Sequence, residues 1–409
     1  ASSTPANAIA SYITIENLEI RSGRPPYQFT DDNGNSSSYS SNAASIFVEL
    51  GQHITIRNCT IHDSGNGIFV ADNNGQTRDI LIANNYLFDN GISGSIFHHN
   101  SYTEAIGVTF EFNRFGPLRA DAPGNNLKDR SAGLVVRYNW IEGGNRQLDL
   151  VESDSNTLFS DPSYRTTYAY GNILIEPDGE GNRQFIHYGG DNGNTSIYRK
   201  GDFYFFNNTV ISTRGDRTTL ARVSTADETM HAFNNVIYCT ASGSELSLLD
   251  DDGILDLQNN WIKDGWVESH AGSGFAGVIN DLGNNLTGAD PSFADFGGQD
   301  FTLLESSTLV DSAIAVTLPG HDLLFEYVLH RDGVAKNIVG SLDIGAFEYQ
   351  AGNFELGDVN QDGSVNLLDV APFVELLSAG TYQAEADCNQ DGSVNLLDVD
   401  PFVAILGSG

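Results

Sequence analysis

Two segments near the end of the chain place oxygen-bearing side chains at alternate positions. DVNQDGSVNLLDVAPFVELL begins at Asp358 and DCNQDGSVNLLDVDPFVAIL begins at Asp387. Each has a glycine where a loop would bend sharply and a carboxylate at its twelfth position. Oxygen donors at this spacing wrap around Ca²⁺. Two copies of one spacing favour a calcium-binding module over a merely solvated acidic tail.

The duplicated loop resembles the type I dockerin domain, in the Asn-Leu-Leu-Asp plus Pro-Phe-Val form of planctomycete-like secreted proteins. The resemblance implies two Ca²⁺ ions, a protein partner, and two apolar helices after the loops. It implies as ligands Asp358, Asn360, Asp362, the Ser364 carbonyl, Asn366 and Asp369 in the first loop, and Asp387, Asn389, Asp391, the Ser393 carbonyl, Asn395 and Asp398 in the second. Without the ion these carboxylates repel one another, so we expect the module to need calcium to fold.

A second set of titratable residues lies in four segments in the middle of the chain, FHHNSY, NNLKDRSA, RQLDLVES and RQFIHYGG. Lysine is rare in this sequence, so Lys128 is conspicuous. If the four segments are strands of successive stacked coils, they lie about 4.8 Å apart and their outward side chains share one groove. We expect these side chains to project outward and to be exposed. The candidate catalytic residues are His99, Tyr102, Lys128, Arg130, Asp149 and His187.

This set contains the functions that β-elimination on a uronic-acid polymer requires. A lysine, histidine or tyrosine can remove the C5 proton, an arginine or Ca²⁺ can neutralise the carboxylate, and a histidine or tyrosine can protonate the leaving oxygen. The alternative is a ladder of surface ion pairs with histidines that only pack. Hydrolysis by two carboxylates is disfavoured, because Asp149 and Glu152 would face opposite sides of a strand.

The elements that must position these residues are strands of a repeat. An alternating apolar strand followed by Asn and another apolar residue recurs ten times, as in ILIANNYL (80–87) and VTFEFNRF (108–115). A second strand series alternates with the first, and turn residues separate the two. This pattern predicts coils stacked into parallel sheets. The recurring Asn is expected to adopt the left-handed corner conformation and to bond to the Asn one coil away. Markers of this position are Asn85, Asn113, Asn139 and Asn172.

Residues 1–290 resemble right-handed parallel β-helix proteins of the pectate-lyase-like superfamily. Residues 291–350 resemble the closing segment of bacterial secreted β-helix proteins, and 351–409 form the dockerin-like domain. The fold class expected is therefore mainly β, a β-helix followed by a small helical calcium module. The motifs of β-helix polygalacturonases, pectate lyases and alginate epimerases are absent from the sequence, so the resemblance indicates no single activity.

Composition limits the partners and the compartment. The chain carries 54 acidic against 20 basic residues and a net charge of −34, which argues against nucleic acid or an anionic membrane as the general partner. The sequence contains no apolar run of about 18 residues, so it predicts no membrane-spanning helix. The three cysteines are far apart, so free thiols are expected. The acidic, Asn- and Gly-rich composition favours a secreted, extracellular or cell-surface protein.

Two functions remain open from the sequence. The first is a protein that binds or cleaves an extracellular acidic polysaccharide, with a polysaccharide lyase as the enzyme considered, attached to a protein partner through its tail. The second is a non-catalytic structural or adhesive protein that assembles through its ends as a homo-oligomer. The first repeat strand starts at Ile13 after a short polar stretch, so we expect upstream residues or another subunit to cover the first coil.

Overall fold

A computed structural model describes residues 9–350, 356–360, 364–389, 391 and 393–407. The chain divides into two compact units, Ala1–Tyr349 and Gln350–Gly409. Each unit is described by itself. Among the described residues, no helix has the length and apolar character needed to cross a membrane.

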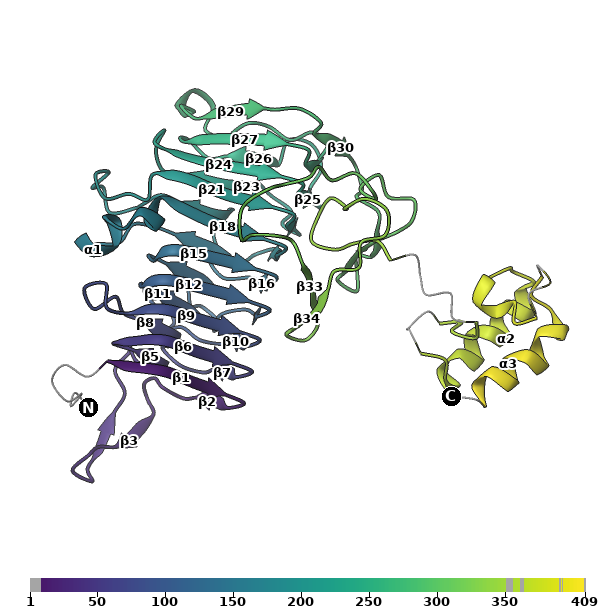
Figure 1. The fold of residues 1–409 in the computed structure, drawn as a ribbon, viewed down its shortest axis with the longest axis horizontal. Coiled ribbons are helices and arrows are strands. Elements are labelled where there is room, and N and C mark those ends of the chain that lie inside the picture. The colour runs from purple at the N-terminus through teal and green to yellow at the C-terminus, as the bar shows by residue number, and fades with distance from the viewer. Residues whose placement is uncertain (1–8, 351–355, 361–363, 390, 392, 408–409) are drawn as a thin grey trace. The chain divides into compact units, whose positions relative to one another are not determined.

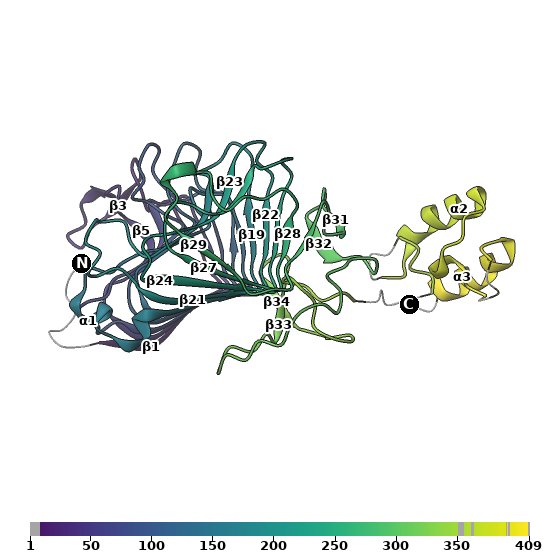
Figure 2. The ribbon, with the colours of Figure 1, turned by 90° about the horizontal axis from the view of Figure 1, so that it is seen from above.

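The first unit is a stack of coils, each adding a strand to parallel sheets (Figures 1 and 2). The first sheet contains β1 (Ala10–Glu16), β6 (Gly51–Arg57), β9 (Arg78–Ala83), β12 (Ile106–Glu111), β15 (Ala132–Arg137), β18 (Thr166–Tyr170), β21 (Gly201–Phe206), β24 (Glu228–Phe233), β27 (Ile254–Gln258) and β29 (Val278–Asp281). The second contains β2 (Glu19–Arg21), β7 (Thr60–His62), β10 (Tyr86–Phe88), β13 (Arg114–Phe115), β16 (Trp140–Glu142), β19 (Ile173–Glu176), β22 (Thr209–Ser212), β25 (Val236–Cys239), β28 (Trp261–Lys263) and β30 (Leu286–Gly288).

The third sheet carries the candidate site. It contains β5 (Ala44–Val48), β8 (Asn66–Val70), β11 (Ser101–Thr103), β14 (Leu127–Asp129), β17 (Leu148–Leu150), β20 (Gln184–Tyr188), β23 (Thr218–Val223) and β26 (Leu246–Leu249). Side chains alternate across each strand, so one set, such as Leu148 and Leu150, enters the apolar core between the sheets. The other set faces outward. The predicted mainly β solenoid is confirmed.

A ladder of asparagines joins the coils between the first and second sheets. The side-chain oxygen of Asn139 accepts the backbone N–H and the side-chain amide of Asn113, at 3.0 and 2.9 Å. Asn139 donates in turn to Asn172 at 3.0 Å. The predicted bond between coils is therefore confirmed. The predicted left-handed conformation was wrong for the four marker residues, because the residue before each of them has the positive φ, as at Tyr138 (55°). In other coils that corner residue is itself an asparagine of the repeat, as at Asn58 (53°), so the prediction holds there.

The closing segment, residues 289–349, packs along the second sheet and returns toward the early coils. Phe301 stacks on Trp140 with ring centroids 5.7 Å apart. Further along, the Arg331 guanidinium donates to the Cys59 carbonyl at 2.8 Å. The segment contains β31 (Phe293–Asp295), β32 (Asp300–Leu303), β33 (Phe325–Val328) and β34 (Asp332–Ala335) in two antiparallel pairs. Trp140 and Trp261 are buried beneath it, so neither is available to stack on a sugar.

Short elements decorate the coils. The β3–β4 hairpin (Gln28–Thr30 and Ser36–Ser38) lies in the first coil. The turns η1 (Pro162–Arg165) and η2 (Gly272–Gly274) and the helix α1 (Asn156–Phe159) occupy loops between sheets. Cys59 and Cys239 are buried free thiols in this unit, and Cys388 is one in the second.

The second unit is helical. It contains η3 (Leu367–Asp369), α2 (Val370–Ala379), η4 (Ala384–Ala386), η5 (Leu396–Asp398) and α3 (Val399–Leu406). Each helix follows one of the two acidic loops, as predicted. Phe373 of α2 and Phe402 of α3 stack with ring centroids 4.0 Å apart in a small separate core.

Candidate functional site

The outward positions of the third sheet form one column across successive coils. The strand register aligns Phe47, Phe69, Tyr102, Lys128, Asp149, His187 and Arg222. Because neighbouring strands lie about 4.8 Å apart, this column brings together residues that are distant in the sequence. His99 lies two residues before the column strand β11, and Arg130 immediately follows β14. The structure thus brings all six predicted residues into one region.

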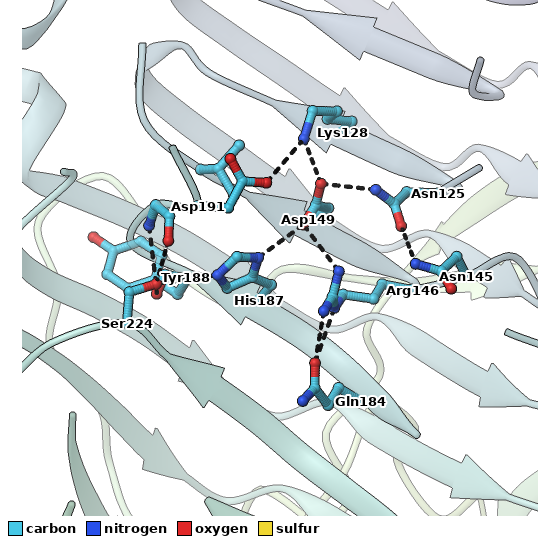
Figure 3. Close-up of polar contacts among 12 residues, drawn as sticks. Asn125, Lys128, Asn145, Arg146, Asp149, Gln184, His187, Tyr188, Asp191 and Ser224 are labelled. Carbon is cyan, nitrogen blue, oxygen red and sulfur yellow. Dashed lines mark hydrogen bonds and ion pairs between the residues drawn. The ribbon is translucent and has the colours of Figure 1, made fainter. Parts of the chain in front are cut away.

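Asp149 lies at the centre of the polar contacts in that region (Figure 3). Its Oδ2 accepts from the Lys128 ammonium at 2.6 Å and from the Asn125 side-chain amide at 2.7 Å. Its Oδ1 is 3.1 Å from His187 Nδ1 and 3.6 Å from the Arg146 guanidinium. Burial opposes ionisation, but Lys128, the His187 hydrogen bond and Arg146 outweigh it and hold the pKa of Asp149 well below its ordinary value. Asp149 is therefore a fixed anion and not a general base.

His187 is a buried neutral imidazole. Burial lowers its pKa from the ordinary value, and the Asp149 carboxylate only partly opposes that shift. A neutral ring whose Nδ1 faces a carboxylate carries its proton there, so Nε2 accepts from the Ser224 hydroxyl at 3.1 Å. Asp149, His187 and Ser224 follow the order of a serine hydrolase triad. However, Ser224 Oγ also contacts Tyr188 O, Gly190 O and Gly190 N at 2.9–3.1 Å, and Ser224 does not line the groove described below. These contacts indicate a structural hydroxyl.

His99 is also neutral and buried. Burial and the positive charge of Lys128 lower its pKa to about 3. Its Nδ1 accepts the backbone N–H of Asn125 at 2.9 Å, which leaves the ring proton on Nε2. His99 can therefore donate a hydrogen bond, but it does not exchange a proton near neutral pH.

A groove of about 410 Å³ runs over this part of the third sheet. Its polar lining includes Tyr102, Lys128, Arg130, Arg146, Asp149 and Asp191. The Arg130 guanidinium lies 6.0 Å from the Tyr102 ring centroid and 3.6 Å from the Glu152 carboxylate. Burial raises the pKa of Tyr102, although the charge of Arg130 opposes this effect. Tyr102 is thus a phenol beside a fixed cation inside an open groove.

The expectation that the candidate residues are exposed was wrong, because four of them are buried and Tyr102 and Arg130 are half-buried. Lys128 is only 9 % exposed, and Asp149, His187 and His99 are 1–2 % exposed. An outward direction on a strand does not ensure contact with solvent. Loops that carry Phe97, Pro123 and Asp191 wall the groove above the sheet and cover the strand residues.

The sequence analysis missed several polar partners of the site. Asn125 and Arg146 both contact Asp149, and Gln184 accepts from Arg146 at 2.7 Å while it donates to Asp250 at 2.7 Å. Asn125 and Arg146 begin the very segments that carry Lys128 and Asp149, NNLKDRSA and RQLDLVES. Their place at the start of the segments that contain Lys128 and Asp149 could have identified them as partners of the site.

The two acidic loops of the second unit have matching internal bonds. The Asp369 carboxylate accepts the backbone N–H of Asn360 at 2.9 Å and of Asn366 at 2.8 Å. Asp398 accepts from Asn389 and Asn395 at 3.0 and 2.8 Å. The Asn366 and Asn395 side chains cap the turns η3 and η5. The twelfth-position carboxylate therefore ties each loop to the turn that follows.

These loops fit a hard cation that binds oxygen. Asp358, Asp369, Asp387 and Asp398 are buried, yet residues 351–409 include no lysine or arginine to neutralise them. Buried carboxylates need such a partner. No three His, Cys, Asp or Glu side chains form a metal-binding group in the described residues. The predicted ligand sets also include asparagine side-chain oxygens and a serine carbonyl. These are Asn360, Ser364 and Asn366 in the first loop, and Asn389, Ser393 and Asn395 in the second loop, which also contains Asp391. Asp362 lies outside the described residues.

Comparison with known families supports this interpretation of the second unit. A model of the dockerin type I domain matches residues 356–401. Type I dockerin domains bind calcium and attach proteins to a cohesin partner, typically outside the cell or at its surface. A search of curated proteins finds no match to the chain.

Proposed function

We propose that the groove on the third sheet binds an acidic polysaccharide. The observation that carries this proposal is the local charge. Lys128, Arg130 and Arg146 line the groove with two carboxylates, Asp149 and Asp191, whereas acidic residues exceed basic ones by 54 to 20 in the whole chain. A cationic site within low-dielectric walls attracts an anionic ligand more strongly than the same charges on an open surface. The carboxylates of a uronic-acid polymer match this arrangement.

The reaction that the groove supports best is β-elimination. Lys128 and Arg130 would neutralise the uronate carboxylate, which makes the C5 proton more acidic. Tyr102, as phenolate, would take that proton while the C4–O4 bond breaks and a C4=C5 double bond forms. The Tyr102 phenol formed in this way would return the proton to the departing O4, which leaves as a hydroxyl group. His99 would donate a hydrogen bond to the sugar, because its pKa of about 3 prevents it from acting as the base.

Binding without turnover is the second candidate. The Lys128 ammonium already donates a hydrogen bond to Asp149 at 2.6 Å, and Asp149 and His187 are nearly inaccessible to solvent. Such mutually satisfied charges are also typical of a structural ion-pair cluster. In that case the protein would recognise its polymer and leave it intact.

A panel of uronic-acid and sulfated polysaccharides distinguishes the two candidates. We expect binding of at least one polymer together with ultraviolet absorbance from the unsaturated product. Lys128→Ala should weaken binding at least tenfold, since a hydrogen bond to a charged group contributes about 1.5–3 kcal/mol. Lys200→Ala is the matched control, because Lys200 pairs with Asp227 at 2.7 Å and does not line the groove. Binding without absorbance would favour the non-catalytic function, and no binding would refute the proposal.

The second unit would attach the protein through calcium and a cohesin-like partner. We propose one Ca²⁺ in each loop. The duplicated leucine pairs Leu367–Leu368 and Leu396–Leu397 are 67–82 % exposed, which is unusual for leucine side chains and leaves two similar apolar contacts for a partner. A secreted or cell-surface location would follow from this attachment.

A further inference from the structure

One end of the groove is apolar. Phe69, Ile96, Phe97 and Tyr102 line it, while Lys128, Arg130 and Arg146 line the rest. Phe97 is 72 % exposed and Ile96 is 59 % exposed. Neither side chain belongs to a core cluster of the β-helix, so packing does not explain them.

The apolar end continues as an aromatic column on the third sheet. The Phe47 and Phe69 rings lie 5.3 Å apart, and the Phe69 and Tyr102 rings lie 4.9 Å apart. Phe47 is 57 % exposed. Each ring belongs to a different coil, so the rings repeat at the strand spacing of about 4.8 Å. A sugar unit in an extended polysaccharide advances by about the same distance.

We propose that Phe69 and Phe97 form a subsite for an uncharged sugar, directly beside the cationic subsite for a uronate. This inference rests on the proposed function. Aromatic rings attract the C–H-bearing face of a pyranose and bury its apolar area. The register places Tyr102 between Phe69 and Lys128, so one polymer lying along the column would meet the aromatic rings first and the cations next.

The two subsites have a consequence for substrate class. A uronate above Phe69 and Phe97 would give up water around its carboxylate without gaining a cation there. An uncharged hexose or N-acetylhexosamine has no such penalty. The preferred polymer is therefore one in which uronate alternates with an uncharged sugar, in place of a polymer of uronate alone.

The test compares oligosaccharides of equal length by calorimetry with the full chain. One is an alternating uronate–N-acetylhexosamine oligomer and the other is an oligomer of uronate alone. We expect the alternating oligomer to bind at least tenfold more tightly. Phe97→Ala should weaken that binding about tenfold, and it should change the weaker binding of the uronate oligomer less than twofold. Tyr12→Ala, which truncates an 80 % exposed ring on the first sheet, should change neither.

Each other outcome rejects a defined part of the argument. The proposal of an uncharged subsite would be overturned, and the proposed function left in place, if both oligomers bind equally well, Phe97→Ala changes neither affinity, and Lys128→Ala weakens the binding of both. Binding of neither oligomer would overturn both. Phe69→Ala is the second variant, and its thermal unfolding identifies any loss that comes from folding, since Phe69 also contacts Phe47 and Tyr102.

Discussion

Asp149 is the residue that determines how the candidate site is built. It is a buried anion that contacts Lys128, Asn125, His187 and Arg146. Asp149→Asn would leave these donors without their charge partner, so we expect a loss of about 3–5 kcal/mol in the free energy of unfolding. Urea denaturation at neutral pH measures it.

The same residue gives the site a defined pH dependence of stability. The pKa of Asp149 is lowered on folding, so its contribution is complete above the unfolded value of 3.8 and is lost as pH falls through the folded value. The pKa of His187 is also lowered, so its contribution to stability is present above pH 6.5 and declines as pH falls below that value.

Asp191→Asn is the control for Asp149→Asn in the urea experiment, because Asp191 is exposed and lies 4.0 Å from Lys128. An equal loss in both variants would contradict the central role of Asp149.

Tyr102 decides whether the groove performs chemistry. If its phenolate is the base, the rate of elimination should rise about tenfold per pH unit through the neutral range, because burial raises the pKa of the phenol above 10. Tyr102→Phe should abolish product formation and change polysaccharide binding less than threefold. The measurements are initial rates across pH and calorimetric binding. A rate that is independent of pH, or full turnover by the variant, would assign the proton transfer to another group.

The coils depend on the asparagine ladder at the scale of elements. Asn139 both accepts from Asn113 and donates to the Phe110 carbonyl at 3.0 Å, and it is fully buried. Asn139→Ala would leave those buried groups unpaired, so we expect a loss of about 2–4 kcal/mol in the free energy of unfolding, measured in urea. Asn285→Ala removes a partly exposed member of the ladder at the last coil and should cost about 1 kcal/mol. Equal costs would contradict the argument that burial determines how much each asparagine of the ladder contributes.

The same elements explain what the sequence could and could not predict. Alternation along strands such as LVVRYNWI depends on local chemistry, so the coils and the core side of each strand were predictable. The positive φ at Tyr138 and Phe112, one residue before the ladder, was not, because bulky aromatic residues seldom adopt it. At Asn84 the same corner is occupied by asparagine, which adopts this conformation more readily. The burial of Lys128 depends on loops from other coils, and a local pattern carries no information on those contacts.

At the scale of the molecule, charge is distributed unevenly. The net charge of −34 repels an anionic polymer over the Debye length, about 8 Å at physiological salt. The three cations of the groove act at shorter range and in a partly enclosed space. A polymer would therefore be attracted only where it enters the groove, which favours selective over general binding of polyanions.

The separation into two units leads to the last prediction, which concerns calcium. Buried Asp358, Asp369, Asp387 and Asp398 lie in a unit without lysine or arginine, whereas the first unit has its own apolar core. Chelation should therefore unfold the second unit and leave the β-sheet circular dichroism unchanged.

Chymotrypsin is the suitable probe of this unfolding, because residues 351–409 contain no lysine or arginine for trypsin to cleave at and Tyr382 offers an exposed aromatic site. We expect rapid cleavage of the tail in chelator and protection when Ca²⁺ is restored. Asp369→Ala should need a higher Ca²⁺ concentration for protection, whereas Glu375→Ala, outside both loops, should behave as the unmodified chain does. If the tail resists chymotrypsin equally with and without chelator, the second unit does not need calcium to fold.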